Sequence, residues 1–194
     1  MREGVDFAVP AQRTVVLSER VFKTVSDTVT PQGVIAIARR EPASFAAALA
    51  AARVACWPLL ALDGVQDPGN VGAIARSAAA AGAPSLAVLE SSADPYGPKA
   101  IRASAGNVFR LLVARGTAAD LDGLDVWGAD AEGGEPLAAA AVERAEVLLL
   151  GGEVQGLRAP VAHRVTIPIA PGVESLNVAA AAAVLLFELR RRLA

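Results

Sequence analysis

Hydrophobic and polar positions along the chain follow two alternating patterns. Short aliphatic runs, several of them bounded by Gly, Pro or Asp, are typical of strands buried on both faces of a sheet. Such runs predict strands at 14–17, 34–38, 59–62, 86–89, 109–113, 126–128, 147–150 and 165–167. Longer stretches predict helices at 19–26, 43–53, 71–81, 98–104 and 178–193. This alternation predicts an α/β fold with a mainly parallel sheet flanked by helices.

The pattern changes character near residue 55. The first 40 residues are more polar, and their short patterns supply about two strands and one helix, which is small for an independent domain. We therefore expect residues 1–54 to form an N-terminal appendage and residues 55–194 to form the main domain. The 194 residues in total are ample for one hydrophobic core.

Composition excludes several classes of protein. With 54% hydrophobic and 20% charged residues, the chain is not expected to be disordered. A single cysteine, Cys56, rules out a disulfide framework and a cysteine-based zinc site, and its apolar neighbours predict burial. The longest uninterrupted apolar run, residues 178–187, is too short to span a bilayer, and the N-terminus lacks the apolar run of a signal peptide. We therefore expect a cytoplasmic protein that uses neither a membrane nor a metal.

Charge is unevenly distributed, although the formal net charge is only −2. Residues 120–146 contain eight acidic side chains and one basic side chain, whereas the two flanking stretches are mildly basic. The net charge therefore does not decide which partners the protein binds.

Three loops that could carry chemistry each follow a predicted strand. Ligands of parallel α/β proteins bind at the carboxyl ends of strands, so these loops are candidate site segments. In the first loop, Asn70 either caps the next helix or serves a ligand. Arg76 is the only charged residue between Asp67 and Glu90, and a lone guanidinium in such an apolar helix needs an anionic partner unless it is simply solvated.

The second and third loops combine glycine or proline with a few polar groups. The strand at 147–150 runs into residues 151–156, where three glycines would let backbone groups approach a flat ligand closely. This spacing matches neither the dinucleotide-binding nor the phosphate-binding loop, and Glu153 could be an exposed turn residue. The third loop contains two prolines and leads to Ser175 and Asn177, of which Ser175 could cap the last helix.

Together these loops closely resemble the three motifs of the SpoU family of RNA ribose 2′-O-methyltransferases, within the SPOUT class. Residues 70–76 match the first motif, N-x-G-x-x-x-R. Residues 151–157 match the second, G-x-E-x-x-G-L. Residues 167–178 match the third, in which I-P is followed by S-L-N-V. The motifs occur in the order typical of the family, and the resemblance covers residues 58–194.

The resemblance implies features that composition cannot show. It implies a sheet whose C-terminal part is threaded into a deep trefoil knot, S-adenosyl-L-methionine bound in that knot, and an obligate homodimer. The implied cofactor-binding residues are Gly151, Gly152, Gly156, Ile167 and Leu176. The implied catalytic residues are Asn70, Arg76, Glu153, Ser175 and Asn177.

The resemblance also implies an RNA partner. Residues 21–34 resemble the end of the L30e-like RNA-binding domain that many members carry, so only the last third of such a domain is expected here. The candidate RNA-binding cations, each of which could equally be a solvated surface charge, are Arg20, Lys23, Lys99, Arg102 and Arg110. The acidic stretch 120–146 contributes to none of the three motifs, and we expect it to lie largely on a face away from RNA.

Methyl transfer to a ribose hydroxyl requires that the hydroxyl be aligned with the methyl group and lose its proton. Arginine holds its proton in water, so we expect Arg76 to bind the substrate phosphate and stabilise the developing alkoxide. A phosphate-assisted proton transfer is the alternative. Glu153 would orient Asn70 or Arg76, while Ser175 and Asn177 would orient the ribose. His163 lies outside the motifs and is expected at the surface.

The substrate stays open between two classes of RNA. Residues 30–33 resemble rRNA-type members and favour 23S-type rRNA, whereas the terminal Arg190–Arg192 is a basic extension of the kind tRNA enzymes carry. These arginines also complement a helix dipole. A catalytically silent RNA-binding dimer and a nicotinamide-nucleotide oxidoreductase are further alternatives. The intact motifs argue against the first, and the glycine spacing argues against the second.

Overall fold

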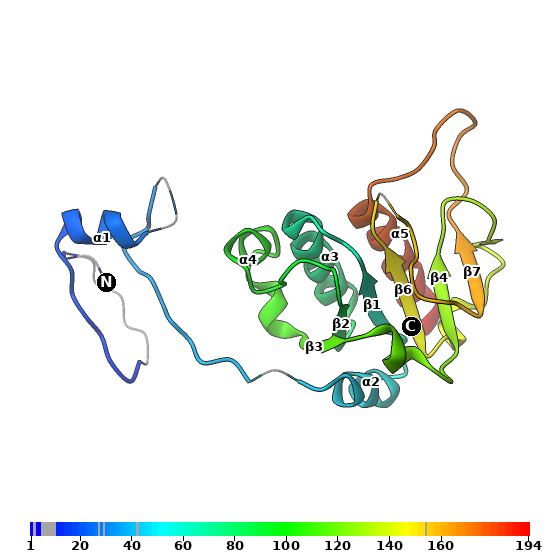
Figure 1. Cartoon of the computed structure of the whole chain (residues 1–194), viewed down its shortest axis with the longest axis horizontal. Coiled ribbons are helices and arrows are strands. Elements are labelled where there is room, and N and C mark those ends of the chain that lie inside the picture. Colours follow the sequence, from blue (N-terminus) through cyan, green and yellow to red (C-terminus); the bar gives the residue numbers. More distant parts are fainter. Residues whose placement is uncertain (2, 5–10, 27, 29, 42, 154) are drawn as a thin grey trace. The chain divides into compact units, whose positions relative to one another are not determined.

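The computed structural model describes residues 1, 3–4, 11–26, 28, 30–41, 43–153 and 155–194. They divide into two compact units, Met1–Glu41 and Pro42–Ala194, which Figure 1 shows with their secondary structure. The expected boundary at residue 54 is wrong, because α2 (Phe45–Val54) belongs to the larger unit. Phe45, Ala48 and Leu49 of this helix are buried against the sheet.

Among the described residues of the smaller unit there is one helix, α1 (Glu19–Val25), which buries Phe22. The helix predicted at 19–26 is confirmed, but the strands predicted at 14–17 and 34–38 are not formed. In this segment the Leu17 carbonyl accepts the Glu3 N–H and the Leu17 N–H donates to the Met1 carbonyl, and the Val15 carbonyl accepts from the Met1 ammonium group. An isolated pairing of this kind does not make a sheet. Residues 27 and 29 of the L30e-like segment lie outside the described residues, so that likeness stays a prediction.

The larger unit is built on a seven-stranded sheet in the order β3-β2-β1-β6-β4-β7-β5, and every neighbouring pair is parallel. The strands are β1 (Leu59–Asp63), β2 (Ser85–Leu89), β3 (Leu112–Gly116), β4 (Val126–Ala129), β5 (Glu135–Pro136), β6 (Val147–Gly151) and β7 (His163–Thr166). The predicted α/β class with a mainly parallel sheet is confirmed. The chain order reverses between β1 and β6, which is where ligands bind in open parallel sheets.

Alternate residues of the central strands face opposite layers of helices. Leu60 and Leu62 of β1 pack with α3 (Pro68–Ala81) and α5 (Val178–Leu193), whereas Leu59 and Ala61 pack with α2. The same alternation holds along β2 and β6, as expected for strands buried on both faces. Figure 1 shows α3 and α5 on one side of the sheet and α2 on the other.

Close contact between α3 and α4 (Pro98–Ala103) depends on a glycine. A Cβ atom added to Gly72 would lie 2.3 Å from the carbonyl oxygen of Ala100, which no real side chain tolerates. The first motif therefore also contains the point at which α4 packs against α3.

Helix ends follow local chemistry, with one correction. Ser44 caps α2 through the Ala47 N–H, and Gly82 ends α3 in the left-handed conformation. Asn70 is not the cap of α3. Asp67 accepts the Gly69 N–H and Pro68 opens the first turn, so Asn70 lies inside the helix with its amide free for other partners.

Two further predictions are wrong for local reasons. The 3₁₀ helix η1 (Asn107–Arg110) occupies the start of the strand predicted at 109–113, and β3 begins at Leu112. Cys56 is exposed rather than buried, because it lies in the turn after α2 with a left-handed φ of 54°. Short 3₁₀ turns η2 (Ala118–Leu121) and η3 (Val142–Arg144) connect the later strands.

Two C-terminal arginines, Arg190 and Arg192, bond α5 to the end of α3 and to the acidic stretch. Arg190 donates to the carbonyl of Ala80 at the end of α3. Arg192, with 13% of its side chain exposed, pairs with Glu143 and Glu188 and also donates to the carbonyls of Leu137 and Ala140. Arg192 therefore connects the last helix to the acidic stretch. In the described parts of the chain, no helix has the length and apolarity to cross a membrane, and the cytoplasmic location stays a prediction.

Candidate functional site

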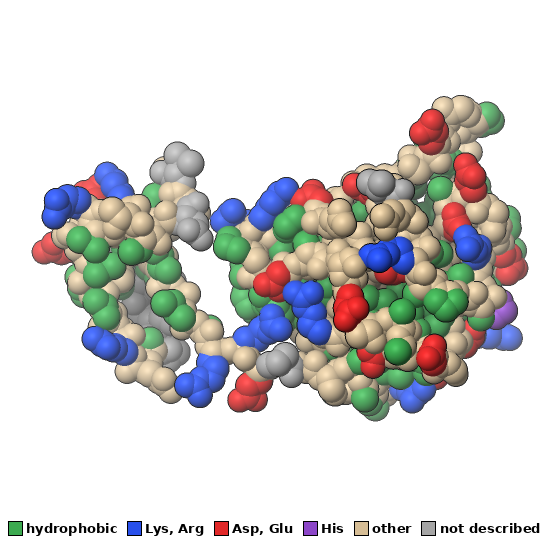
Figure 2. Space-filling view, in the orientation of Figure 1, with side chains coloured by type: hydrophobic (Ala, Val, Ile, Leu, Met, Phe, Trp, Pro, Cys, Tyr) green, Lys and Arg blue, Asp and Glu red, His purple; other side chains and the backbone are tan. Residues whose placement is uncertain are grey.

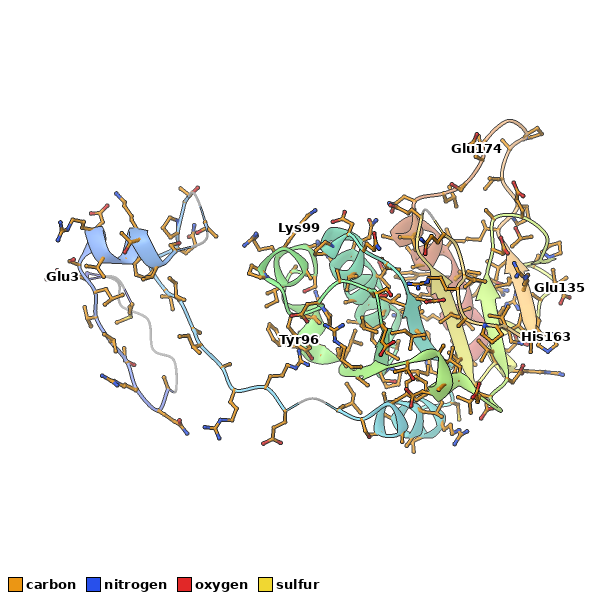
Figure 3. The ribbon with its side chains drawn as sticks, in the orientation of Figure 1. Glu3, Tyr96, Lys99, Glu135, His163 and Glu174 are labelled. Carbon is orange, nitrogen blue, oxygen red and sulfur yellow. The ribbon has the colours of Figure 1, made fainter. Side chains whose placement is uncertain are left out.

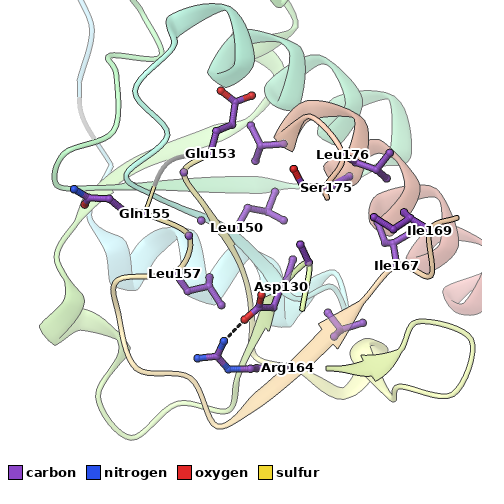
Figure 4. Close-up of a pocket in the computed structure, with 18 residues that line it drawn as sticks. Asp130, Leu150, Glu153, Gln155, Leu157, Arg164, Ile167, Ile169, Ser175 and Leu176 are labelled. Carbon is purple, nitrogen blue, oxygen red and sulfur yellow. Dashed lines mark hydrogen bonds and ion pairs between the residues drawn. The ribbon is translucent and has the colours of Figure 1, made fainter. Parts of the chain in front are cut away.

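A cavity of about 340 Å³ opens at the carboxyl ends of β4, β6 and β7, beside the start of α5. Figure 4 shows its walls converging from these elements. The lining residues are Ala129, Asp130, Ala131, Leu150, Gly151, Gly152, Glu153, Gln155, Gly156, Leu157, Arg164, Val165, Ile167, Ile169, Ser175, Leu176, Val178 and Ala181. All five predicted cofactor-binding residues are among them. The structure therefore brings these five residues of the second and third motifs into one cavity, although Gly151 and Leu176 are 25 positions apart in the sequence.

One wall of the cavity requires glycine. A Cβ atom at Gly151 would lie 2.3 Å from the carbonyl carbon of Gly156, and one at Gly152 would lie 2.2 Å from the carbonyl oxygen of Gly64. Both contacts are with backbone, which cannot move aside as a flexible side chain can. The Gly156 N–H donates to the Gly152 carbonyl and closes the turn. The wall is thus bare backbone, suited to a flat ligand.

A cluster of three polar side chains adjoins this wall, and we call it the polar cluster. Glu153 Oε1 accepts from Asn70 Nδ2 at 2.9 Å and from Asn177 Nδ2 at 2.7 Å. Asn177 Nδ2 also lies 3.2 Å from Asn70 Oδ1. Each of the three motifs contributes one residue, from α3, from the loop after β6 and from the start of α5. Only Glu153 of the three also lines the cavity.

Asn177 has a second task that the sequence pattern had assigned to Ser175. Its Oδ1 accepts the N–H groups of Ala179 and Ala180 and so caps α5. This leaves Ser175 free, and its side chain lines the cavity (Figure 4). The loop that carries Ser175 joins β7 to α5, and Figure 3 labels its exposed Glu174.

Arg76 does not join the polar cluster. Its side chain is exposed on α3, and it forms neither a hydrogen bond nor an ion pair with any residue that the structure describes. The separation of six residues places the side chains of Asn70 and Arg76 on different faces of the helix. Among the described residues the guanidinium of Arg76 is therefore solvated, and it is available to an anionic ligand.

The five candidate RNA-binding cations lie in different parts of the molecule. Arg20 and Lys23 belong to α1, where Lys23 pairs with Glu19. Lys99 bonds Asp67 at 2.6 Å, and this bond, followed by the Gly69 N–H, holds the pKa of Asp67 below its ordinary value. Arg102 and Arg110 are exposed and unpaired among the described residues.

Figure 2 shows Lys and Arg side chains over α4 together with hydrophobic ones. An exposed aromatic residue, Phe109, precedes Arg110 and contacts Tyr96 with ring centroids 5.9 Å apart. An aromatic side chain among cations is a common feature of RNA-binding surfaces, but the motif search did not single out Phe109.

Sequence reasoning missed the charged pair in the cavity wall. Asp130 and Arg164 form an ion pair there, marked by the dashed line in Figure 4. Asp130 belongs to the acidic stretch 120–146, which was expected to lie largely on a face away from RNA, and that expectation stays a prediction. The position of Asp130 directly after a predicted strand, at the end where ligands bind, was the available signal.

His163, the first residue of β7, lies at the surface as predicted (Figure 3). Its ring stacks on that of Trp127. The described residues contain no group of three or more His, Cys, Asp or Glu side chains that could hold a metal ion. The groups that line the cavity and are available to a ligand are glycine backbone, aliphatic side chains and the charged groups of the wall.

The fold and the site define an α/β domain that binds a small ligand in a glycine-walled cavity at the carboxyl ends of parallel strands. A model of the SpoU rRNA Methylase family matches residues 58–187, so the chain belongs to this family. The resemblance drawn from the three motifs is thereby confirmed.

Individual relatives are also named as RNA methyltransferases. The 23S rRNA (guanosine(2553)-2'-O)-methyltransferase RlmP of Bacillus subtilis is 32% identical, over 90% of this chain and 71% of its own length. An uncharacterized tRNA/rRNA methyltransferase of Synechocystis is 35% identical, over 91% of this chain and 66% of its own. The crystal structure of an AdoMet-bound rRNA methyltransferase from Sinorhizobium meliloti matches with a TM-score of 0.78 and 29% identity, covering 92% of this chain and 72% of that chain. The chain spans about half, 52%, of an rRNA methyltransferase 3A of Danio rerio.

Proposed function

We propose that the protein transfers a methyl group from S-adenosyl-L-methionine to a ribose 2′-hydroxyl of RNA, with 23S-type rRNA as the favoured substrate. The observation that carries the proposal is the position of Glu153. This carboxylate lines the cavity and at the same time holds Asn70 and Asn177, so the ligand cavity and the polar cluster meet at one side chain. Methyl transfer needs a cofactor site and an acceptor site that adjoin, because the methyl donor and the ribose hydroxyl have to meet in line.

The cavity suits the proposed cofactor in size and chemistry. Its volume of about 340 Å³ falls at the lower end of the range for small-molecule sites. Glycine backbone on one side and Leu157, Ile167 and Leu176 on the others would enclose the adenine ring. The lining contains two carboxylates, those of Asp130 and Glu153, and one guanidinium, that of Arg164. This excess of negative charge favours binding of the cationic sulfonium of the cofactor. When bound, the cofactor supplies an electrophilic methyl group.

The chain's own residues have separate tasks in this proposal. Glu153 fixes the amides of Asn70 and Asn177, so that they present a preorganised polar surface to the ribose. Ser175 Oγ contributes a further hydrogen bond to the ribose at the cavity wall. Arg76 binds the phosphate next to the target nucleotide and stabilises the negative charge that develops on the ribose oxygen, while the proton of the hydroxyl passes to that phosphate. Its exposed side chain, without a partner among the described residues, supports this assignment.

The RNA class is favoured by the relatives' names, since RlmP is named for 23S rRNA and the Sinorhizobium protein for rRNA. Another solved structure, of a protein named for methylation of C/U34 on tRNA, is 30% identical over 69% of this chain. This similarity makes tRNA the second candidate substrate. Methylation mapping of rRNA and tRNA from a strain lacking the gene, before and after complementation, distinguishes them.

The homodimer and the trefoil knot belong to the same proposal. Val184 and Phe187, one turn apart on α5, are 44% and 49% exposed, an apolar stripe that a second copy would cover. The loops after β6 and β7 both line the cavity beside α5, which is consistent with the threading expected of the family. Sedimentation at several concentrations tests the dimer.

The role of Arg76 gives the most direct test of the chemistry. Loss of a charge-stabilising donor slows catalysis by about 10²–10³, so we expect Arg76→Ala to reduce kcat by about that factor and Arg76→Lys to recover a small part. The affinity for S-adenosyl-L-methionine, measured by calorimetry, should stay unchanged in both. Arg191→Ala, which removes an exposed arginine outside the motifs, serves as the control. Near-wild-type kcat in both Arg76 variants would contradict the assignment.

A further inference from the structure

One buried carboxylate in the larger unit has no place in the proposed chemistry. Asp63 is the last residue of β1, only 5% of it is exposed, and it lies in register with Gly151 of β6. A carboxylate is rarely buried to this extent without strong partners. Its partners are found far along the chain, in the loop that follows the glycine wall.

Asp63 Oδ2 accepts two backbone hydrogen bonds, from the Arg158 N–H at 2.6 Å and from the Ala159 N–H at 2.7 Å. Both partners lie more than 90 residues away in sequence. The backbone of Asp63 takes part as well, since its carbonyl accepts the Gly152 N–H at 2.9 Å. Asp63 therefore binds the loop at both ends of the glycine wall.

The loop has few other attachments along this stretch. Among the described residues, the Gly156 N–H bonds to Gly152 and the Ala162 N–H bonds to Val126. Between these two points, the backbone N–H groups of the loop that find a partner are those of Arg158 and Ala159, and both donate to Asp63. Without the carboxylate, two buried or half-buried N–H groups would lose their acceptor.

The attachment point is adjacent to the cavity. Gly156 and Leu157 line the cavity and directly precede Arg158. The Leu157 side chain packs over β4, where a Cβ atom at Gly128 would lie 2.4 Å from Leu157 Cδ1. Ala159 is buried in the core with α2. The position of the wall formed by Gly156 and Leu157 thus depends on where Asp63 holds the next two residues.

We propose that Asp63 is a positioning residue for the cofactor cavity, holding the Gly156–Leu157 wall in its binding geometry through the Arg158 and Ala159 N–H groups. The inference rests on the proposed function in taking S-adenosyl-L-methionine as the ligand. Without Asp63, the Gly156–Leu157 wall would have to become ordered when the cofactor binds, and this cost would lower the affinity for S-adenosyl-L-methionine. The polar cluster has its own bonds through Glu153, so turnover at saturating cofactor should change much less.

The test compares Asp63→Ala, Asp63→Asn and Ser85→Ala. Ser85 is a matched control, because its buried hydroxyl donates to the Ala48 carbonyl at the amino end of the neighbouring strand, away from the cavity. We expect Asp63→Ala to raise the calorimetric Kd and the KM for S-adenosyl-L-methionine at least tenfold, with kcat within about twofold. Asp63→Asn keeps one neutral acceptor and should give an intermediate shift. Ser85→Ala should lower Tm without changing Kd.

Two results would overturn the inference. One is an unchanged Kd in Asp63→Ala, and the other is an equal rise of Kd in Ser85→Ala at the same loss of Tm. Amide hydrogen exchange without cofactor tests the anchor separately. Exchange at Leu157, Arg158 and Ala159 should be faster in Asp63→Ala than in Ser85→Ala. If the wild-type protein fails to bind S-adenosyl-L-methionine while this exchange difference is present, the proposed function fails and the anchoring role stands.

Discussion

The two halves of the sheet, which meet at the β1–β6 pair, are held together by different interactions. In the β1-β2-β3 half, α2 and α3 cover opposite faces of the strands, and close packing at Gly72 joins α4 to α3. In the β6-β4-β7-β5 half, the strands also bury apolar residues such as Leu148 and Leu150, but irregular loops and 3₁₀ turns connect them. Polar bonds such as those of Asp63 and Arg192 hold these loops. The cavity lies in this second half. Apolar burial thus builds the frame, and long-range polar bonds shape the site.

The largest expected effect comes from filling the glycine contacts in the two halves. Gly151→Ala and Gly72→Ala each place a methyl group about 2.3 Å from backbone. We expect each to destabilise the protein by about 3 kcal/mol, measured by urea unfolding. Gly151→Ala should also abolish binding of S-adenosyl-L-methionine in calorimetry, whereas folded Gly72→Ala should retain it. Loss of binding in both would show that the halves do not act separately.

A smaller effect is expected from the arginines at the end of α5. Arg192 is 13% exposed and bonds two carbonyls in the second half, whereas the neighbouring Arg191 is 70% exposed and pairs with Glu188 alone. Arg192→Ala should therefore cost about 2–3 kcal/mol of stability, because it leaves buried acceptors unpaired. Arg191→Ala should cost no more than about 0.5 kcal/mol. Equal losses in thermal or urea unfolding would mean that the bonds to Leu137 and Ala140 contribute nothing.

The smallest effect concerns acid sensitivity at the contact between α2 and the second half. The Asp125 N–H, and after it the Arg53 guanidinium, hold the pKa of Glu146 below its ordinary value of 4.5. A lowered pKa in the folded state means that this carboxylate stabilises the protein above pH 4.5 and that the contribution is lost as pH falls through the folded value. Glu146→Gln should accordingly show a shallower fall in Tm between pH 6 and pH 3. A fall as steep as in the wild type would contradict the assignment.

The frame could be predicted from the sequence, because its signals are local. The period of apolar residues placed α5 at 178–193 correctly, and aliphatic runs placed β1 and β6 to within a residue. The strand predicted at 109–113 was misplaced because residues 107–110 form a 3₁₀ turn after Gly106, whose φ is 76°. The two-residue strand β5 is too short to leave any pattern.

The site was only partly predictable, because its geometry is made by distant partners. The family motifs identified Asn70, Glu153 and Asn177, which the structure joins by hydrogen bonds, although their separation in sequence exceeds 80 residues for the first two. The motifs could not show that Asp67 rather than Asn70 caps α3, or that Asn177 rather than Ser175 caps α5. Nothing local to Asp63 or Asp130 indicates which groups they contact, since those partners approach only when the sheet is complete.

The polar cluster has a consequence for synthesis. Its three residues leave the ribosome at positions 70, 153 and 177, and the helix that Asn177 caps is the last element of the chain. A nascent chain that has just released β6 carries Leu60, Leu148 and Leu150 without the α5 residues that cover them. Such a chain exposes an apolar sheet face, which invites association with other chains. Asn177 is therefore synthesised together with the helix that covers this apolar face of the sheet, and a chain released before α5 lacks both the complete polar cluster and that cover.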